Sequence, residues 1–358
     1  MKKLLVIAVA LASVNAFGSR ARMTALGSSP HLVDTQTVYT NPSDMFYVGG
    51  DYVTVESGLT TTATQNANAE GMVVRSMGDA KMGLSLGHQS TNASDWGLRS
   101  FAPNLTGPAN ANQQNPLELS YGMKTGDMAW GGTLVYSNYN DKVNDEKESS
   151  TGARFGMRMG AIDFSVGLGL VNTVDTAATK YKGTIGLSGN VGYTMENMYA
   201  FAGVTNAGAK LENAAGTELA NFTRMDIQAG VVSSNKKDGN EFFYGAKLFS
   251  RADKETIADT KTTILNLPIW MGLEVEASSW MAFRGSLTQN LVLLDNTKTE
   301  TAGTATTETA PGANSTTAAF GAGLKFNKLT VDGTILATGL QTYSATALLS
   351  QVGVTYMF

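Results

Sequence analysis

The stretch Gln351-Val-Gly-Val-Thr-Tyr-Met-Phe358 carries an apolar side chain at every second position and stops on one of them. The alternating positions are Val352, Val354, Tyr356 and Phe358. Successive side chains of a β-strand point to opposite faces, so this spacing predicts a strand with one apolar face. The last residues of soluble proteins usually fray. A chain that stops on an aromatic residue within a strand therefore needs a partner along that strand.

The same alternation recurs through most of the sequence after residue 45. In the segment 183–194, Ile185, Leu187, Val191 and Tyr193 are apolar, and the positions between them are polar or glycine. Turn residues divide this part into sixteen expected strands at 46–57, 68–75, 79–89, 115–124, 128–137, 149–159, 161–172, 183–195, 198–205, 221–233, 240–250, 263–276, 279–293, 316–326, 329–337 and 348–358. Runs at helical spacing are almost absent.

The connections between these strands alternate between tight and long. Tight ones are expected near residues 76–79, 125–127, 160, 196–197, 235–239, 278 and 327–328, and long polar ones at 90–114, 138–148, 173–182, 206–220, 251–262, 294–315 and 338–347. Short turns at one end and long loops at the other are typical of membrane barrels. The prediction is an all-β, transmembrane, antiparallel up-and-down β-barrel over 46–358, with about 16 strands, or 14 if 46–57 and 68–75 belong to a plug. A soluble two-sheet protein is the alternative, but so long a meander without a domain break disfavours it.

Composition and the first residues agree with an extracytoplasmic protein. Residues 1–16 combine Lys2-Lys3, a short apolar run and a small-residue pattern before Ala16, which predicts a signal peptide. The sequence has 39 Gly, 16% charged residues and no Cys, so disulfides, thiol chemistry and Cys-based metal sites are excluded. A formal net charge of −4 without a basic block argues against a nucleic-acid partner. No continuous apolar run is long enough for a transmembrane helix.

Aromatic residues gather beside the expected tight turns, where amphipathic rings would lie at the lipid headgroups. They are Trp130, Phe164, Tyr193, Tyr199, Phe242, Phe243, Trp280 and Phe326. We expect them to form an interfacial girdle at that end of the barrel.

The alternation of Val352, Val354, Tyr356 and Phe358 resembles the C-terminal signature that outer-membrane barrels of Gram-negative bacteria present to the barrel assembly machinery. The resemblance implies a bacterial cell outer-membrane location, a lipid-facing wall, and a last strand that pairs with the first and removes both free edges. It also implies tight turns in the periplasm and long loops outside. Porins of this size often assemble as trimers, so a homotrimer is expected by the same resemblance.

Residues 17–45 do not alternate and form either a periplasmic lead-in or a plug in the barrel. They contain Arg20-Ala-Arg-Met-Thr-Ala-Leu-Gly-Ser28 and Thr40-Asn-Pro-Ser-Asp-Met45. Together with segments 203–208 and 326–332, this resembles long-chain fatty acid transporter (FadL-like) and PorV-like barrels, which have an Asn-Pro motif before the first strand. The family motif usually reads Asn-Pro-Ala, whereas this sequence has Asn41-Pro42-Ser43. Family barrels commonly have fourteen strands, whereas about sixteen are expected here. The resemblance implies transport of apolar substrates.

The inner face predicted by the alternation is rich in charge. The pore-lining residues expected from it are Lys81, Lys124, Arg154, Arg158, Arg224, Asp226, Lys247, Glu274, Arg284 and Lys325, with Glu118 and Asp332 as further acids. Sixteen strands leave an aqueous channel unless something fills it. Cations outnumber acids on this face, which predicts a porin for passive diffusion of small hydrophilic solutes with a mild anion preference. The alternative is that these charges pair across the wall and only stiffen it.

Three other functions are possible for such a barrel. A transporter of apolar substrates should have an apolar passage, unlike this inner face. An enzyme needs a positioned base, and the two histidines, His31 and His88, show no triad or metal-ligand spacing, so we expect no catalysis, metal or cofactor. A structural or adhesive barrel stays open, because loop composition does not reveal a ligand.

Overall fold

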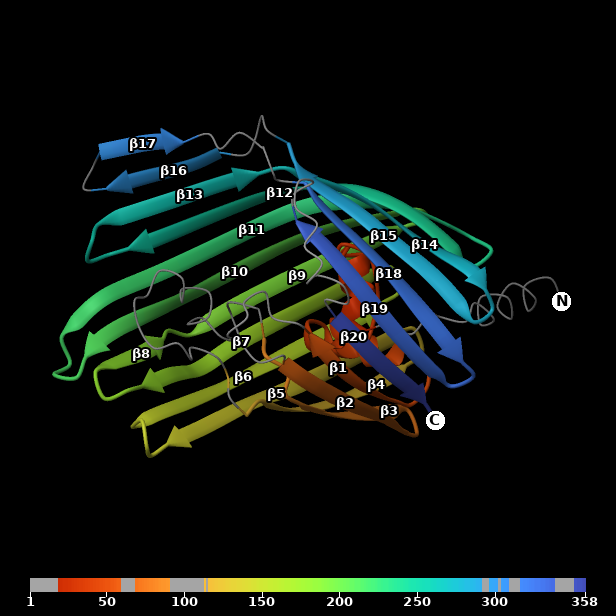
Figure 1. Ribbon diagram of the computed structural model, residues 1–358, viewed down its shortest axis with the longest axis horizontal. Coiled ribbons are helices and arrows are strands. Elements are labelled where there is room, and N and C mark those ends of the chain that lie inside the picture. Colours follow the sequence, from red (N-terminus) through yellow and green to blue (C-terminus); the bar gives the residue numbers. More distant parts are fainter. Residues whose placement is uncertain are drawn as a thin grey trace.

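A computed structural model describes residues 19–58, 68–90, 113, 115–291, 296–301, 304–308, 316–338 and 351–358. The expected signal peptide at 1–16 and parts of the expected loops 90–114, 294–315 and 338–347 lie outside these residues. The described strands occupy sixteen positions around one closed antiparallel barrel (Figure 1). The predicted fold class and the higher of the two strand numbers are confirmed.

Strands that follow one another in the sequence are neighbours in the barrel. The first eight positions are β1 (Tyr52–Gly58), β2 (Asn68–Met77), β3 (Ala80–Leu86), β4 (Leu117–Thr125), β5 (Met128–Asp141), β6 (Glu146–Met159), β7 (Ile162–Asp175) and β9 (Gly186–Met195). The next eight are β10 (Met198–Asn213), β11 (Glu218–Lys237), β12 (Asn240–Glu255), β14 (Pro268–Ser278), β15 (Met281–Asn290), β18 (Thr317–Phe326), β19 (Leu329–Thr338) and β20 (Gln351–Met357). Four short strands extend the wall: β8 (Thr179–Gly183), β13 (Thr260–Asn266), β16 (Asn296–Thr301) and β17 (Thr304–Glu308).

The last strand closes the barrel. β20 pairs with β19 on one side and with β1 on the other, where Val354 lies opposite Val55. Tyr356 and Phe358 point outward, with stacked rings 6.4 Å apart. Pairing of the last strand with the first, inferred from the terminal alternation, is confirmed, and no edge of these two strands is left open.

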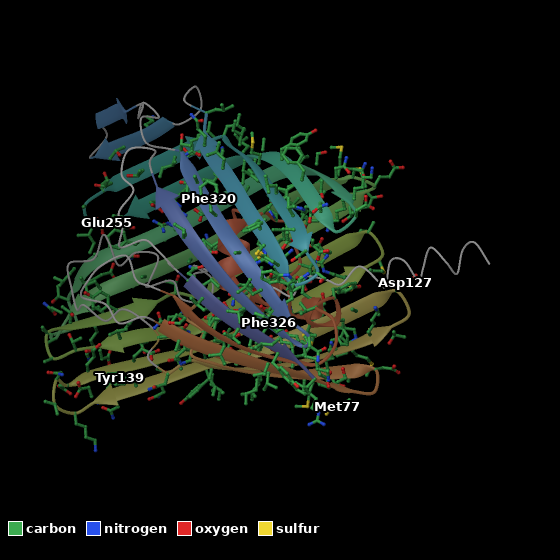
Figure 2. All side chains as sticks on the ribbon, turned by 45° about the vertical axis from the view of Figure 1, so that its right-hand side comes forward. Met77, Asp127, Tyr139, Glu255, Phe320 and Phe326 are labelled. Atoms are coloured by element: carbon green, nitrogen blue, oxygen red, sulfur yellow. The ribbon has the colours of Figure 1, made fainter. Side chains whose placement is uncertain are left out.

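Seven two-residue turns lie at one end of the barrel, at 78–79, 126–127, 160–161, 196–197, 238–239, 279–280 and 327–328. All seven were expected. We call this end the turn end and the opposite one the loop end. Figure 2 shows Met77 and Asp127 at the turn end and Tyr139 and Glu255 at the loop end. The C-terminus lies at the turn end (Figure 1).

The loop end corrects several expected boundaries. The loops expected at 138–148, 206–220 and 251–262 are mostly strand, because β5, β6, β10, β11 and β12 run on to short turns; the one at 173–182 contains the end of β7 and most of β8. The low-complexity region 294–315 contains β16 and β17. Strand ends that leave the membrane need no apolar face, so their sequences lack the alternation that marks the rest.

Two expected strands differ from the structure, one by a break and one by a later start. The expected strand 263–276 is interrupted at 267, because Pro268 lacks the N–H that a ladder needs. The expected strand 46–57 begins only at Tyr52. Residues before it form short helices, α2 (Arg20–Ala25), η1 (Gln36–Tyr39) and η2 (Pro42–Phe46). None of the helices in the described residues is long and apolar enough to cross a membrane.

The outer surface of the wall is apolar. More than a third of each of these side chains is exposed: Leu84, Leu134, Phe155, Val191, Ile227, Met271 and Phe320. Figure 2 shows Phe320 and Phe326 on the outside of β18. An apolar surface of this extent is unfavourable in water but matches the hydrocarbon core of a bilayer. The wall is therefore that of a transmembrane β-barrel, with its apolar side chains turned toward the hydrocarbon of a bilayer.

The lipid-facing wall predicts the effect of a new charge on stability. Phe320→Lys should lower the free energy of unfolding by about 2–4 kcal/mol, because an ammonium group is costly near the bilayer midplane. Urea titration of the protein folded into lipid vesicles measures this change. Val143→Lys is the control, since Val143 is 92% exposed in a loop-end turn, and it should change stability by less than about 0.5 kcal/mol. Equal effects of the two substitutions would contradict a membrane-embedded β18.

Candidate functional site

Residues 19–51, here called the N-terminal insert, lie inside the barrel. Helix α2 contacts β15, β18, β19 and β20, whereas η2 contacts β4, β5 and β6. These two groups of strands lie on nearly opposite sides of the wall. Figure 1 shows the helices of the insert within the lumen, nearer the turn end. The insert therefore spans the lumen rather than lining one side of it.

Helix α2 is short and depends on the wall for its position. Ser19 caps it by accepting from the Arg22 N–H at 3.3 Å, and the same hydroxyl donates to Asp332 of β19 at 3.1 Å. The chain leaves the helix through Gly27, whose φ of +63° favours glycine. A six-residue helix is not stable alone. Its contacts with the wall therefore supply most of its stability.

Arg22 is the centre of a buried ion-pair network that joins the insert to the wall. Its guanidinium donates to Glu274 of β14 at 2.7 and 3.1 Å and to Asp34 of the insert at 2.8 Å. Arg284 of β15 also donates to Glu274, at 2.6 Å, and continues to Asp332. Burial alone would lower the pKa of Arg22, but attraction to Glu274 and Asp34 outweighs it and raises that pKa. Removing one partner from such a network costs about 3–5 kcal/mol.

On the opposite side, a row of glycines makes room for the insert. Gly122, Gly131 and Gly156 lie opposite one another across β4, β5 and β6. A Cβ on Gly131 would lie 2.8 Å from the carbonyl group of Pro42, and one on Gly156 would collide with the Asn41 side chain. Contacts this close are possible only without a side chain. The Asn-Pro pair therefore rests directly on the backbone of the wall.

Charged groups also hold the insert where Asn41-Pro42 contacts the glycine row. The Asn41 side chain caps η2, and Asp44 in its first turn accepts from Arg158 of β6 at 2.5 Å. Lys81 of β3 donates to two backbone carbonyl groups of the insert, at 2.9 and 2.7 Å. Lys81 thus supplies hydrogen-bond donors to one carbonyl group of η2, that of Met45, and to one after it, that of Gly50.

A third contact is apolar and includes a histidine. The cluster consists of Leu26 and Leu32 from the insert and Tyr199, Val232, Phe243 and Trp270 from the wall. Beside it, His31 Nε2 lies 2.9 Å from Glu241 of β12, and its Nδ1 lies 3.0 Å from the Ser29 hydroxyl. Trp270 Nε1 donates to that hydroxyl at 2.9 Å. These contacts fix the loop between α2 and η1 against β12 and β14.

A cavity of about 620 Å³ lies between the insert and the wall strands β6 to β12. The insert contributes Arg20, Met23, Leu32, Gln36, Tyr39 and Asp44 to its lining, and the wall contributes Arg158, Asp163, Ser165, Asn190, Tyr199, Phe201, Gln228 and Lys247. Most of these side chains are polar. A volume of this size suits a small organic molecule.

The structure brings some of the predicted pore-lining residues to the insert. Lys81, Arg158 and Glu274 contact it directly, and Arg284 contacts it through Glu274. The Lys124 ammonium lies 5.1 Å from the centre of the Tyr47 ring.

The other predicted residues contact one another or neighbouring strands. Arg154 makes two hydrogen bonds to Glu118, Arg224 pairs with Asp253, Asp226 pairs with Arg251, Lys325 pairs with Glu276, and Lys247 donates to Gln228. Seven of the ten predicted residues are thus in ion pairs. The field of the inner face is therefore weaker than the number of cations suggested.

Two aromatic residues expected at the membrane interface lie inside instead. Tyr199 is 9% exposed and Phe243 is fully buried, and both pack against the insert. The alternation already predicted an inward position for Phe243. Phe242 is 49% exposed and faces outward, so the next residue, Phe243, has to face the lumen. A large apolar side chain facing a wide lumen indicates that something fills it.

The histidines and carboxylates of the described residues form no metal site. Within the described ranges, no group of three or more His, Cys, Asp or Glu side chains converges as a metal ion requires. His88 Nδ1 lies 2.7 Å from a Glu118 carboxylate oxygen, and the Tyr39 ring stacks on the His88 ring with the two ring centres 3.6 Å apart.

The sequence matches no protein-family model and no curated protein. Among solved structures, a loop L8 deletion mutant of OmpT, an outer-membrane protein of Vibrio cholerae, is similar with a TM-score of 0.38 and 11% identity, over 86% of this chain and 97% of that one. The toluene transporter TodX of Pseudomonas putida has a TM-score of 0.41 and 12% identity, over 96% and 99%. The iron transporter FrpB of Neisseria meningitidis has 0.42 and 10%, over 82% and 56%.

The glycine row predicts a local effect of one added side chain. Gly131→Val should displace Pro42 and expose the insert, so that protease cleavage and amide hydrogen exchange within residues 19–51 increase. Gly132→Val is the matched control, because its Cβ would meet nothing closer than 3.7 Å, and it should leave the insert protected. Unchanged exchange of the insert in Gly131→Val would contradict the close contact.

Proposed function

We propose that the protein is an outer-membrane uptake channel for small polar solutes that its N-terminal insert keeps closed at rest. The observation that carries this proposal is the position of the insert, which spans the lumen and is held to the wall at Arg22, Asp44 and His31. A barrel of sixteen strands would otherwise leave a wide aqueous channel. A solute has to pass the polar cavity and then the insert.

This proposal revises the simple porin expected from the inner-face charges. Most of those charges form ion pairs, so a general preference for anions has to come from the few cations that lack a carboxylate partner. The residues that line the cavity, rather than all inward-facing residues of the wall, would then select the solute. Recognition of the last strand by the barrel assembly machinery and assembly as a homotrimer stay predictions.

A transporter of apolar substrates is the second candidate, favoured by the Asn41-Pro42 motif and its seat on the glycine row. The polar lining of the cavity opposes it, because an apolar molecule would leave those groups without hydrogen bonds. Liposome swelling with arabinose tests the first function. Growth of a deletion strain on long-chain fatty acids tests the second, and a defect repaired by this protein would favour it.

We propose no catalytic role. Ser29, His31 and Glu241 form a chain of hydrogen bonds, but the Ser29 hydroxyl already accepts from Trp270 and the residue is 1% exposed. The chain of hydrogen bonds accounts for attachment of the insert to the wall.

Planar-bilayer recording tests whether the insert closes the channel. The wild type should show low conductance with brief openings, and Arg22→Met should raise the ratio of open to closed channels by at least about 100-fold, because the closed state loses about 3–5 kcal/mol. Arg251→Met is the control, since Arg251 pairs with Asp226 between two wall strands. A wild type that is open as continuously as Arg22→Met would refute closure by the insert.

A further inference from the structure

The inner face of β11 and β12 carries a series of polar pairs that leads from the loop end to the cavity. Arg224 pairs with Asp253 at 2.6 Å, and Arg251 pairs with Asp226 at 2.8 Å. Each of these pairs joins opposite charges, so they cancel at short range. The next cation toward the turn end is Lys247.

Lys247 differs from the cations above it. Its ammonium donates to the Gln228 side-chain oxygen at 3.1 Å and lies 5.8 Å from the centre of the Phe249 ring. Among the described side chains, no carboxylate lies within ion-pair distance of it. An ammonium group has three donors, so Lys247 keeps donors for a ligand.

The two arginines that line the cavity both have carboxylate partners. Arg158 lies 2.5 Å from Asp44 and 3.7 Å from Asp163, and Arg20 pairs with Glu70. Arg158 faces two carboxylates, so these groups together with Lys247 carry no net charge, and Lys247 is the one cation among them without a carboxylate at ion-pair distance. A single unmatched cation favours an anion with one negative charge.

The surroundings of Lys247 combine amide groups with apolar contacts. Gly230 lies between its stem and the Phe201 ring, since a Cβ there would meet both at 2.7 Å. Gln228 and Asn190 bring side-chain amides beside Gly203. A ligand with its charged end at Lys247 would therefore place its body along the Phe201 ring.

We propose that this cavity binds a small organic carboxylate with an aromatic or short aliphatic body, and that Lys247 is its counter-charge. The proposal rests on the proposed function, because it names the class of solute that the channel takes up. A carboxylate matches one ammonium and two amides, whereas a phosphate dianion usually needs several cations or a nest of N–H groups. The cavity of about 620 Å³ accommodates a molecule of this size with bridging water.

Isothermal titration calorimetry of the full-length mature protein in detergent tests the site, with sodium benzoate as the probe and neutral benzamide as its isostere. Benzoate should bind saturably, at least about tenfold more tightly than benzamide. Lys247→Met should weaken benzoate binding about tenfold and leave benzamide unchanged, and Lys247→Arg should retain most of the affinity. Lys247→Gln replaces the methionine variant if that one does not fold.

Lys124→Met is the matched control, because Lys124 also faces inward but lies over the Tyr47 ring, outside the cavity. It should bind benzoate as the wild type does. Equal affinity for benzoate and benzamide, an unchanged affinity in Lys247→Met, or an equal loss in Lys124→Met would overturn the proposal. Binding in detergent requires no conduction, so a failure of the channel in bilayers is read separately from a failure of this site.

Discussion

The ion pairs of Arg22 constrain the rest of the lumen. A guanidinium buried inside a protein is costly unless carboxylates surround it. Arg22 meets this condition with one carboxylate from the insert, Asp34, and one from the wall, Glu274. Because Glu274 belongs to the wall, α2 can leave its place only by breaking this ion pair. The position of α2 and the orientation of Arg284 depend on it, and so does the closure of the lumen that we propose.

The width of the barrel explains why a segment such as the N-terminal insert can lie inside it. The inward side chains of sixteen strands cannot meet across the lumen, so a barrel of this size is open unless another segment enters it. The insert fills the turn-end half of the lumen and is held at two places. Ion pairs of Arg22 hold α2, and close packing on the glycine row holds η2. The cavity is the space that remains beside it. Wall and insert each contribute part of its lining, so a movement of the insert would change the cavity and the passage together.

The sequence predicted the wall well because lipid imposes a rule on it. Every second residue of a membrane strand has to be apolar, so alternation together with turn residues predicted about sixteen strands and their tight turns. The strand ends beyond the membrane escape that rule, and their boundaries were wrong.

The site was harder to predict because its contacts join distant residues. Nothing in the local pattern pairs Arg22 with Glu274, 252 positions away. Two signals did exist in the sequence: glycines at inward positions of three consecutive strands, and Phe243 at an inward position beside outward Phe242. Each indicates a filled lumen, but only the register between strands shows that Gly122, Gly131 and Gly156 form one row.

A reversible covalent lock tests the central claim, that solutes pass only when the insert moves. The protein has no cysteine, and a Cβ on Gly321 of β18 would lie 2.6 Å from that of Ala25 in α2. A small shift of α2 therefore permits a disulfide in the variant Ala25→Cys/Gly321→Cys. Arabinose influx into liposomes should stop on oxidation and return on reduction, with no response in either single variant. Equal influx in the oxidised and reduced double variant would contradict the account.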